Sequence, residues 1–434
     1  MDADKMILGD GEKAVYSTDC DETGLNNNVI VCAGSGGGKT VSIAEPRLLE
    51  TYNSSLVVTC TKRRIVEKYK KMFIDRGYTA IELNFANPPG SDVAYDPLAY
   101  VSSYTDINYL SESIVTAHPR KNECTSTDPF WDESAVSLLS ALIAYVLKTE
   151  ESPNFVDVLN LLDSLLIKED CSRTVTSLDP RFHRIIENDP HSYAATCWKT
   201  FVSLPARTAG TVYGVLNTTI DKIFSPELRE MISSKDKVNF QKIVDRKTVL
   251  FVTTSPVNPS LHYFVNMFYG QMFKQLFEYA ESLPSGKLSR PVSVLADDFA
   301  TGSRILNFPE YISIFREKQI SVMLLIQSET QLESIYGYHD AVTIINNCDT
   351  YVYMGGMDIA TCRKISERLN VPLEDVLYMP IGQEVIFRRG QRPVVTQRYN
   401  VMHNPMYQSI TKNYEKSLSI AEKYDISTKT KSRL

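Results

Sequence analysis

A glycine-rich stretch that ends in Lys-Thr is the strongest chemical signal in the sequence. Glycines let the backbone curl around a polyphosphate with its N–H groups pointing inward, a lysine can reach the β and γ oxygens, and a threonine hydroxyl can ligate Mg²⁺. The sequence therefore predicts a phosphate-binding loop made of Gly34, Ser35, Gly36, Gly37, Gly38, Lys39 and Thr40. The usual pattern begins with glycine where this chain has Ala33. A plain glycine-rich turn is the competing interpretation.

Two carboxylates form a second chemical group. The apolar run Val292–Ala296 ends in Asp297 and Asp298, which would lie at the carboxyl end of a sheet that already holds the phosphate loop. We expect Asp297 to bind Mg²⁺ directly or through water, and Asp298 to face the attacking water. The alternative is an Asp-Asp turn cap. The next apolar run ends in Gln327, which could sense the γ-phosphate or orient water.

These residues need a sheet to hold them in place. Short apolar runs alternate with segments of helical periodicity before residue 86, which predicts a parallel sheet covered on both faces. The expected strands are Val29–Cys32, Ser55–Cys60, Thr79–Phe85, Thr248–Thr254, Val292–Ala296, Ile320–Ile326, Thr350–Met354 and Gln383–Phe387.

The middle of the chain has a different pattern. Long helical periodicity predicts helices at Asp132–Lys148, Phe155–Ile167 and Gly210–Ile223. We therefore divide the chain into a first part of a nucleotide-binding domain (1–101), an inserted all-α domain for substrate recognition (102–236), the second part of the nucleotide-binding domain (237–403) and a polar C-terminal tail (404–434).

The composition of the 434 residues limits the kinds of binding site and the cellular location that we expect. Lys and Arg total 46 against 52 Asp and Glu, so contact with nucleic acid requires a local basic surface. The eight cysteines form no Cys-x-x-Cys pair and the six histidines no HExxH spacing, which predicts reduced thiols and no metal site beyond Mg²⁺. The longest apolar stretch, Ala135–Leu147, is too short to span a bilayer, so we expect a soluble chain with no transmembrane segment.

Several short motifs follow one another along the chain: Gly24-Leu25-Asn26-Asn27-Asn28, Tyr95-Asp96-Pro97-Leu98, Phe130-Trp131, Asp297-Asp298-Phe299-Ala300, Arg316, Gln327-Ser328, Gln331-Leu332 and Tyr336-Gly337. Taken together, they make the chain resemble the type IV secretion system coupling proteins, the TraG/TraD-like conjugation ATPases, from about Gly24 to Tyr399. Here Asp298 stands where the family usually has Glu, and Cys60-Thr61 precede Lys62 where the family has Asp-Pro.

The resemblance implies a RecA-like P-loop NTPase domain interrupted by an all-α domain. It also implies six subunits in a ring, ATP at subunit interfaces and a central channel. Arg316 would be an arginine finger acting on a neighbour's γ-phosphate, with Arg363 and Arg368 left open as alternatives. Family members usually carry N-terminal transmembrane helices, so the resemblance places the parent protein at the cytoplasmic face of the cell membrane.

The expected function is that of an ATP-hydrolysing coupling protein. It would recruit a relaxase–DNA or protein substrate and drive its transfer to the components of a type IV secretion channel, with a hexamer as the active form and a monomer in isolation. Two alternatives stay open. One is an FtsK-like DNA translocase, which normally lacks a large helical insertion. The other is a nucleotide-gated substrate receptor with little hydrolysis, which Asp298 would favour.

Overall fold

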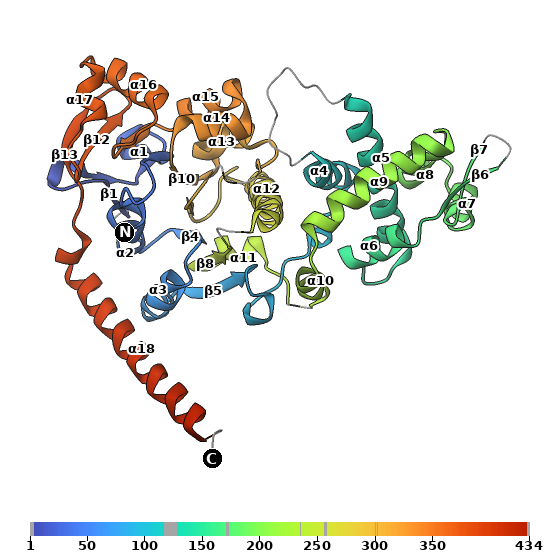
Figure 1. The fold of residues 1–434 in the computed structure, drawn as a ribbon, viewed down its shortest axis with the longest axis horizontal. Helices are drawn as coiled ribbons and strands as arrows, with labels where there is room; N and C mark the ends of the chain where they lie inside the picture. The colour runs from blue at the N-terminus through green and yellow to red at the C-terminus, as the bar shows by residue number, and fades with distance from the viewer. Residues whose placement is uncertain are drawn as a thin grey trace.

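A nine-stranded sheet forms the centre of the larger of two lobes. The computed structural model describes residues 4–116, 128–170, 173–234, 236–255, 258–299, 301 and 303–431, and the strand count refers to these residues. Across the sheet the strands follow the order β13-β12-β11-β3-β10-β9-β4-β8-β5. Figure 1 shows this lobe with the second, helical lobe beside it.

The strands from β11 to β5 run parallel, and the two at the other edge are antiparallel. Continuous apolar runs are typical of parallel strands because helices cover both of their faces. The parallel strands are β3 (Val29–Cys32), β4 (Ser55–Cys60), β5 (Thr79–Asn84), β8 (Thr248–Thr253), β9 (Val292–Ala296), β10 (Ile320–Ile326) and β11 (Thr350–Tyr353). The antiparallel strands are β12 (Gln383–Arg388) and β13 (Val394–Gln397). The parallel sheet predicted from the sequence is confirmed.

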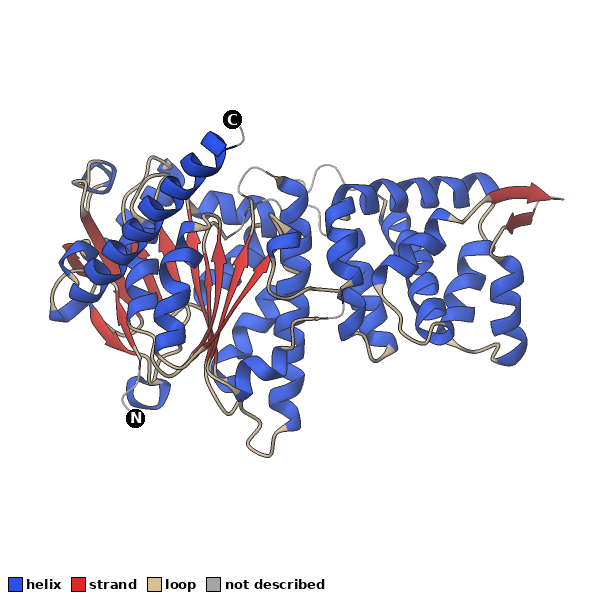
Figure 2. Ribbon diagram, turned by 90° about the horizontal axis from the view of Figure 1, so that it is seen from below, coloured by secondary structure: helices blue, strands red, loops and turns tan. Residues whose placement is uncertain are grey.

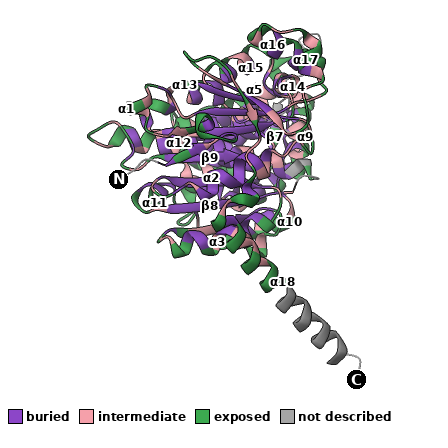
Figure 3. Ribbon diagram, turned by 90° about the vertical axis from the view of Figure 1, so that its left-hand side faces the viewer, coloured by how far each residue is buried: buried purple, intermediate pink, exposed green. Residues whose placement is uncertain are grey.

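Helices cover both faces of this sheet, as Figure 2 shows. One face packs against α2 (Glu45–Leu49), α3 (Arg64–Asp75) and the first turns of α18 (Pro405–Lys431). The other face packs against α11 (Phe240–Asp245), α12 (Pro259–Ser282), α13 (Phe308–Lys318), α14 (Glu329–Tyr336), α15 (Tyr338–Asn346), α16 (Ile359–Leu369) and α17 (Leu373–Leu377). The central strands between the two layers are buried and belong to the purple interior of Figure 3, whereas every second residue of the edge strand β13 is exposed.

A small ribbon precedes the first strand of the sheet. β1 (Lys5–Ile7) and β2 (Val15–Ser17) pair antiparallel, and α1 (Cys20–Thr23) follows them. Short 3₁₀ turns connect other elements: η1 (Glu12–Ala14), η3 (Pro88–Gly90), η4 (Pro97–Tyr100) and η5 (Val401–His403). The ribbon carries none of the residues predicted to do chemistry.

The second lobe lies in the chain between β5 and β8 and is mainly helical. Its helices are α4 (Tyr104–Val115), α5 (Pro129–Thr149), α6 (Phe155–Asp163), α7 (Asp179–Asn188), α8 (Tyr193–Val202), α9 (Ala206–Ile223) and α10 (Pro226–Ser233). By length and composition α5 is apolar enough to cross a membrane, but half of its most apolar window is buried inside the lobe. This combination is also typical of a core helix.

One sequence prediction is wrong in this lobe. The helix expected to run to Ile167 ends at Asp163, and Ile167 instead begins the hairpin of β6 (Ile167–Asp170) and β7 (Arg173–Thr176). β-Branched residues such as Thr174 and Val175 favour a strand, and the mainly polar sequence of the two strands suits a partly exposed ribbon. The hairpin lies at the end of the lobe farthest from the large sheet (Figure 2).

The chain enters and leaves the helical lobe through two adjacent segments. Ala94 and Lys237 form a parallel bridge, and the Lys237 ammonium lies 3.0 Å from the buried Asp96 carboxylate. The same carboxylate accepts a 3.1 Å hydrogen bond from the backbone N–H of Phe155, the first residue of α6. We call Ala94, Asp96 and Lys237 the clasp. It joins the start of the insertion to its end.

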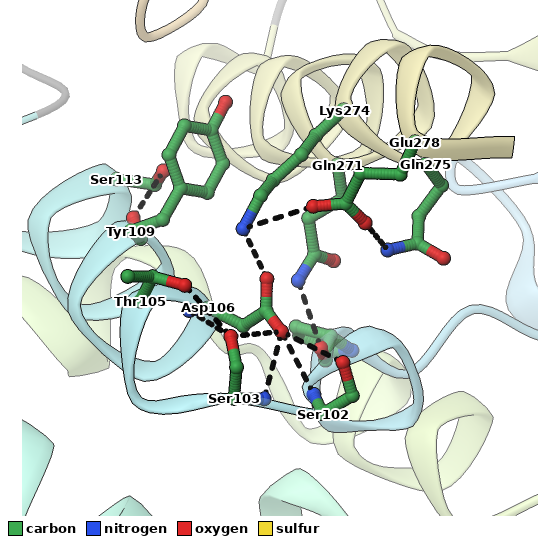
Figure 4. A network of polar contacts seen from close by, with 11 residues as sticks. Ser102, Ser103, Thr105, Asp106, Tyr109, Ser113, Gln271, Lys274, Gln275 and Glu278 are labelled. Atoms are coloured by element: carbon green, nitrogen blue, oxygen red, sulfur yellow. Dashed lines mark hydrogen bonds and ion pairs between the residues drawn. The ribbon is translucent and has the colours of Figure 1, made fainter. Parts of the chain in front are cut away.

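A polar network also ties the lobe to α12 (Figure 4). Asp106 of α4 accepts hydrogen bonds of 2.9 Å from the N–H groups of Ser102 and Ser103, and it forms an ion pair with Lys274 of α12. Nearby, Gln271 of α12 donates 2.9 Å to the Pro97 carbonyl. One apolar core runs through both lobes around this network. The domain boundaries at 101/102 and 236/237 stay predictions.

Candidate functional site

The glycine stretch forms a loop between β3 and the helical turn η2 (Thr40–Ala44), a π-helical turn that continues into α2. Two hydrogen bonds of 3.1 Å fix its start: the Ala33 N–H donates to Ile326 of β10, and the Gly34 N–H donates to the Gly355 carbonyl beyond β11. A Cβ at Gly37 would lie 2.8 Å from the Gly34 carbonyl oxygen, so only glycine fits this turn. The neighbouring strands therefore hold the loop from both sides.

The backbone of this loop presents donors of the kind that bind phosphate. Within the described part of the chain, no backbone carbonyl accepts from the N–H groups of Ser35, Gly36, Gly38 or Lys39. Gly38 has a φ of 84°, a conformation that side chains disfavour. Successive N–H groups in such a turn, next to the start of a helix, make a concave site for anions.

Lys39 is buried at the base of the loop, and its ammonium donates a 2.6 Å hydrogen bond to the Ala33 carbonyl. Burial lowers the pKa of Lys39, and the negative charges of Asp298 and Asp297 oppose this shift. The Thr40 hydroxyl lies 3.3 Å from Oδ2 of Asp297. The two residues expected to hold Mg²⁺ are thus brought together although 257 positions separate them in the sequence.

Asp297 and Asp298 follow β9, as predicted. Burial and the charge of Asp298 raise the pKa of Asp297, while the Lys39 charge and the Thr40 hydroxyl act against that rise. Asp298 has a left-handed backbone with a φ of 54°, and its carbonyl accepts 2.6 Å from the Thr301 hydroxyl. The two carboxylates therefore leave the strand through a sharp turn rather than along an extended segment.

Gln327 stands at the end of β10, the strand between β3 and β9. Ile326 is in register with Cys32 of β3, and Leu324 with Ala296 of β9. Because the carboxyl ends of parallel strands meet at one edge, Gln327 lies at the same edge as the loop and the aspartates. Its side chain is exposed there.

The three arginines considered for a finger lie on α13 and α16. Arg316, near the end of α13, donates 3.5 Å to the Cys20 carbonyl. It precedes the start of the seven-residue β10, so about 20 Å of strand separates it from the phosphate loop of its own chain. Arg368 lies over the Tyr351 ring at 4.9 Å, and Arg363 is exposed on α16. Arg316 therefore does not reach the loop of its own chain.

Arg398, which follows β13, was not predicted from the sequence. Its Nη1 lies 3.5 Å from the position that a Cβ on Gly38 would occupy, beside the phosphate loop. No motif surrounds Arg398, and its closeness to the loop depends on the hairpin of β12 and β13 folding back. Ala300, part of the motif that follows the two aspartates, lies outside the described residues.

A family model described as Type IV secretory system Conjugative DNA transfer matches residues 2–370. The chain belongs to this family. The match includes the phosphate loop, both aspartates and the whole helical insertion. The predicted resemblance is therefore confirmed for most of the chain.

Curated members of the conjugative DNA transfer family are distant relatives. The conjugal transfer protein TraG of Rhizobium radiobacter is 22% identical over 406 residues, which cover 84% of this chain and 60% of TraG. The type IV secretion system-coupling protein VirD4 of Bartonella quintana is 23% identical over 354 residues, 79% of this chain and 53% of VirD4. The chain thus spans little more than half the length of these relatives.

The fold is that of a solved coupling protein. The plasmid coupling protein TrwB in complex with ADP and Mg²⁺ has a TM-score of 0.69 and 15% identity, covering 92% of this chain and 91% of that one. The predicted fold, a RecA-like P-loop domain with a mostly parallel sheet and a helical insertion, is confirmed. The hairpin of β6 and β7 was not part of the predicted fold.

Proposed function

We propose that this chain is the nucleotide-hydrolysing part of a type IV coupling protein. In this role it recruits a relaxase–DNA or protein substrate and uses ATP hydrolysis to drive its transfer to the secretion channel. Membership of the conjugative DNA transfer family supports the coupling role. The phosphate loop with two carboxylates at the same sheet edge supports hydrolysis.

The contact between Thr40 and Asp297 is the observation that carries the proposal. Two neighbouring oxygen ligands of an octahedral Mg²⁺ lie about 3 Å apart, since each metal–oxygen distance is about 2.1 Å. The Thr40 and Asp297 oxygens are 3.3 Å apart, so they fit adjacent positions around Mg²⁺. TrwB, whose fold this chain shares, was solved with ADP and Mg²⁺.

The roles of the remaining residues follow from their positions. The bound Mg²⁺ would neutralise charge on the β and γ phosphates. Lys39 would supply a second cation beside the transferred group, and the loop N–H groups would hold its oxygens. Asp298, one residue past Asp297, and Gln327 on the adjacent strand would orient the attacking water. Arg316 would act on the site of a neighbouring subunit, with Arg363 and Arg368 as the alternatives.

The inserted lobe (102–236) is proposed as the part that faces the substrate, because it projects from the nucleotide-binding lobe in Figures 1 and 2. A family match that includes the insertion favours the coupling role over an FtsK-like translocase. We also propose hexamers as the active form and attachment of the parent protein to the cytoplasmic face of the membrane. A nucleotide-gated receptor with little hydrolysis stays the second candidate, favoured by Asp298 at the water-facing position.

Lys39→Ala tests the central claim. We expect this variant to fold normally and to lose ATP turnover by at least about a hundredfold, because the lysine acts on charge that develops in the transition state. Turnover is measured with Mg²⁺ at high protein concentration, with and without single- and double-stranded DNA. Lys71→Ala is the control, because Lys71 is exposed on α3 and lies outside the group of residues around Thr40 and Asp297. Equal turnover in Lys39→Ala and wild type would refute hydrolysis at this loop, and nucleotide binding without turnover in wild type would favour the receptor.

A further inference from the structure

Arg398 lies on the flank of the phosphate loop opposite the aspartates. On one side of β3 come β10 and β9, which lead to Gln327 and Asp297. On the other side come β11, β12 and β13, and Arg398 follows the last of these. The Thr40–Asp297 contact fixes the Mg²⁺ side of the loop, where the β and γ phosphates belong. The nucleoside end of a bound nucleotide therefore leaves toward the flank that carries Arg398.

The contacts of Arg398 leave part of its guanidinium unused. Its backbone N–H donates 2.7 Å to the Gly382 carbonyl, and its Nη2 donates to the carbonyl of Met354, just past β11. Nη1 lies beside Gly38, and Nε is buried with no hydrogen-bond partner among the described residues. Guanidinium carries five donors in a planar fork that suits phosphate oxygens, and an unsatisfied buried donor in a native structure calls for a partner.

Glu384 of β12 lies behind Arg398 and is fully buried. Both of its carboxyl oxygens lack hydrogen-bond partners within the described part of the chain. Burial raises the pKa of Glu384 to about 8, against the effect of the Arg398 charge, so this carboxyl is mainly protonated at neutral pH. The positive charge of Arg398 therefore stays available for an anion.

We propose that Arg398 is a nucleotide-binding residue supplied by the same chain, and that its guanidinium contacts a phosphate oxygen on the nucleoside side of the bound nucleotide. This inference rests on the proposed function for the existence of the site. It adds to the loop a cation that binds ADP and ATP alike. Arg316 differs from it, because Arg316 would act on a neighbour and on the γ-phosphate.

The test compares Arg398→Gln and Arg398→Lys with Arg392→Gln. Arg392 is exposed in the turn between β12 and β13, so its substitution removes the same charge from the same hairpin. Dissociation constants for ADP and for ATP are measured with Mg²⁺, and the melting temperature is measured without nucleotide. We expect Arg398→Gln to raise the dissociation constants of ADP and of ATP about tenfold or more, because a charged hydrogen bond is lost. The factor should be the same for both nucleotides. Arg398→Lys should restore part of the affinity, and Arg392→Gln should stay within about twofold of wild type.

Three results would overturn the inference. An ADP affinity within twofold of wild type in Arg398→Gln would exclude a phosphate contact. A loss confined to ATP would place the contact at the γ-phosphate. A lower melting temperature that Arg398→Lys fails to restore, together with weaker binding in both variants, would make Arg398 a purely structural residue. Failure of the proposed function looks different: without a nucleotide site, wild type and Lys39→Ala would bind ADP equally poorly, and in a receptor without turnover the ADP affinities of the Arg398 variants would still be measurable.

Discussion

Asp298 combines an unusual side chain with an unusual backbone. The resemblance to the coupling proteins puts Glu at this position, and in the proposed role the shorter Asp would act on the attacking water from a residue with a φ of 54°. Asp and Asn tolerate this left-handed region better than most residues, because their short polar side chains bond locally. Glu gains no such support. The backbone thus suits the shorter carboxylate, and Gln327 on the adjacent strand lies at the same edge to share the water.

We predict that Asp298→Glu and Asp298→Asn both slow hydrolysis. Glu would strain the turn and crowd the γ-phosphate, and misplacement of about 1 Å can cost about a hundredfold in rate. Asn should keep the backbone and the ATP affinity while removing the charge that polarises water. Single-turnover rates decide the outcome. A faster Asp298→Glu enzyme would contradict adaptation to Asp, and an unaffected Asp298→Asn enzyme would remove Asp298 from the site.

The strands of the molecule differ in how well the sequence predicts them. The parallel strands were predictable because burial on both faces gives each of them a continuous apolar run, as in Val249–Val252 of β8. β13 was not predicted, because every second residue of this edge strand is exposed and its apolar signal is weak. The β6–β7 hairpin was missed because its strands, Ile167–Asp170 and Arg173–Thr176, are mainly polar.

The residues of the candidate site also differ in how well the sequence predicts their positions. The phosphate loop and the aspartates were predictable, since each follows a buried strand whose carboxyl end must lie at one sheet edge. Arg398 was not, because its position depends on a hairpin that carries little sequence signal. The contact between Thr40 and Asp297 depends on strand order, which local patterns do not determine.

The contact between α4 and α12 leads to a prediction about pH. Burial alone would raise the pKa of Asp106, but hydrogen bonds from Lys274, Ser102 and Ser103 lower it to about 2 from an ordinary 3.8. A lowered carboxyl pKa adds stability above the unfolded value, and this stability is lost as pH falls through the folded value. The contribution of Asp106 is therefore complete above pH 4 and disappears toward pH 2.

We predict that Asp106→Asn lowers the free energy of unfolding at pH 7 by about 1–3 kcal/mol, because the mostly buried Lys274 then loses its closer carboxylate and keeps only the 3.7 Å pair with Glu278. The difference from wild type should shrink between pH 4 and pH 2 in denaturant titrations. The control is Asp163→Asn, which alters the ion pair between the exposed Asp163 and Arg229. It should lower the free energy of unfolding by less than about 1 kcal/mol. A difference that is independent of pH would refute an ionised Asp106 as the cause.

At the scale of the whole molecule, one chain does not contain a complete site if Arg316 must come from a neighbour. Arg316 is far from the loop of its own chain, so a shared site needs an assembled ring. Assembly of free subunits in solution depends on protein concentration.

We therefore predict that the isolated chain is mainly a monomer at low concentration and a poor ATPase. Its specific activity should rise with protein concentration, or when DNA brings subunits together. Turnover measured over a wide concentration range, alongside sedimentation of the same samples, checks this. A rate that does not change with concentration, from a protein that sediments as a monomer, would contradict a shared active site.

The clasp of Ala94, Asp96 and Lys237 has a mechanical consequence. Because the chain enters and leaves the helical lobe side by side, the lobe is mounted like a lever on a single pivot. A sideways push on the β6–β7 tip is a bending moment about that pivot, and the α4–α12 contact acts as its brace. A small rotation at the clasp becomes a larger sweep at the tip, so the lobe's stiffness depends on these polar groups together with the apolar core that runs through both lobes.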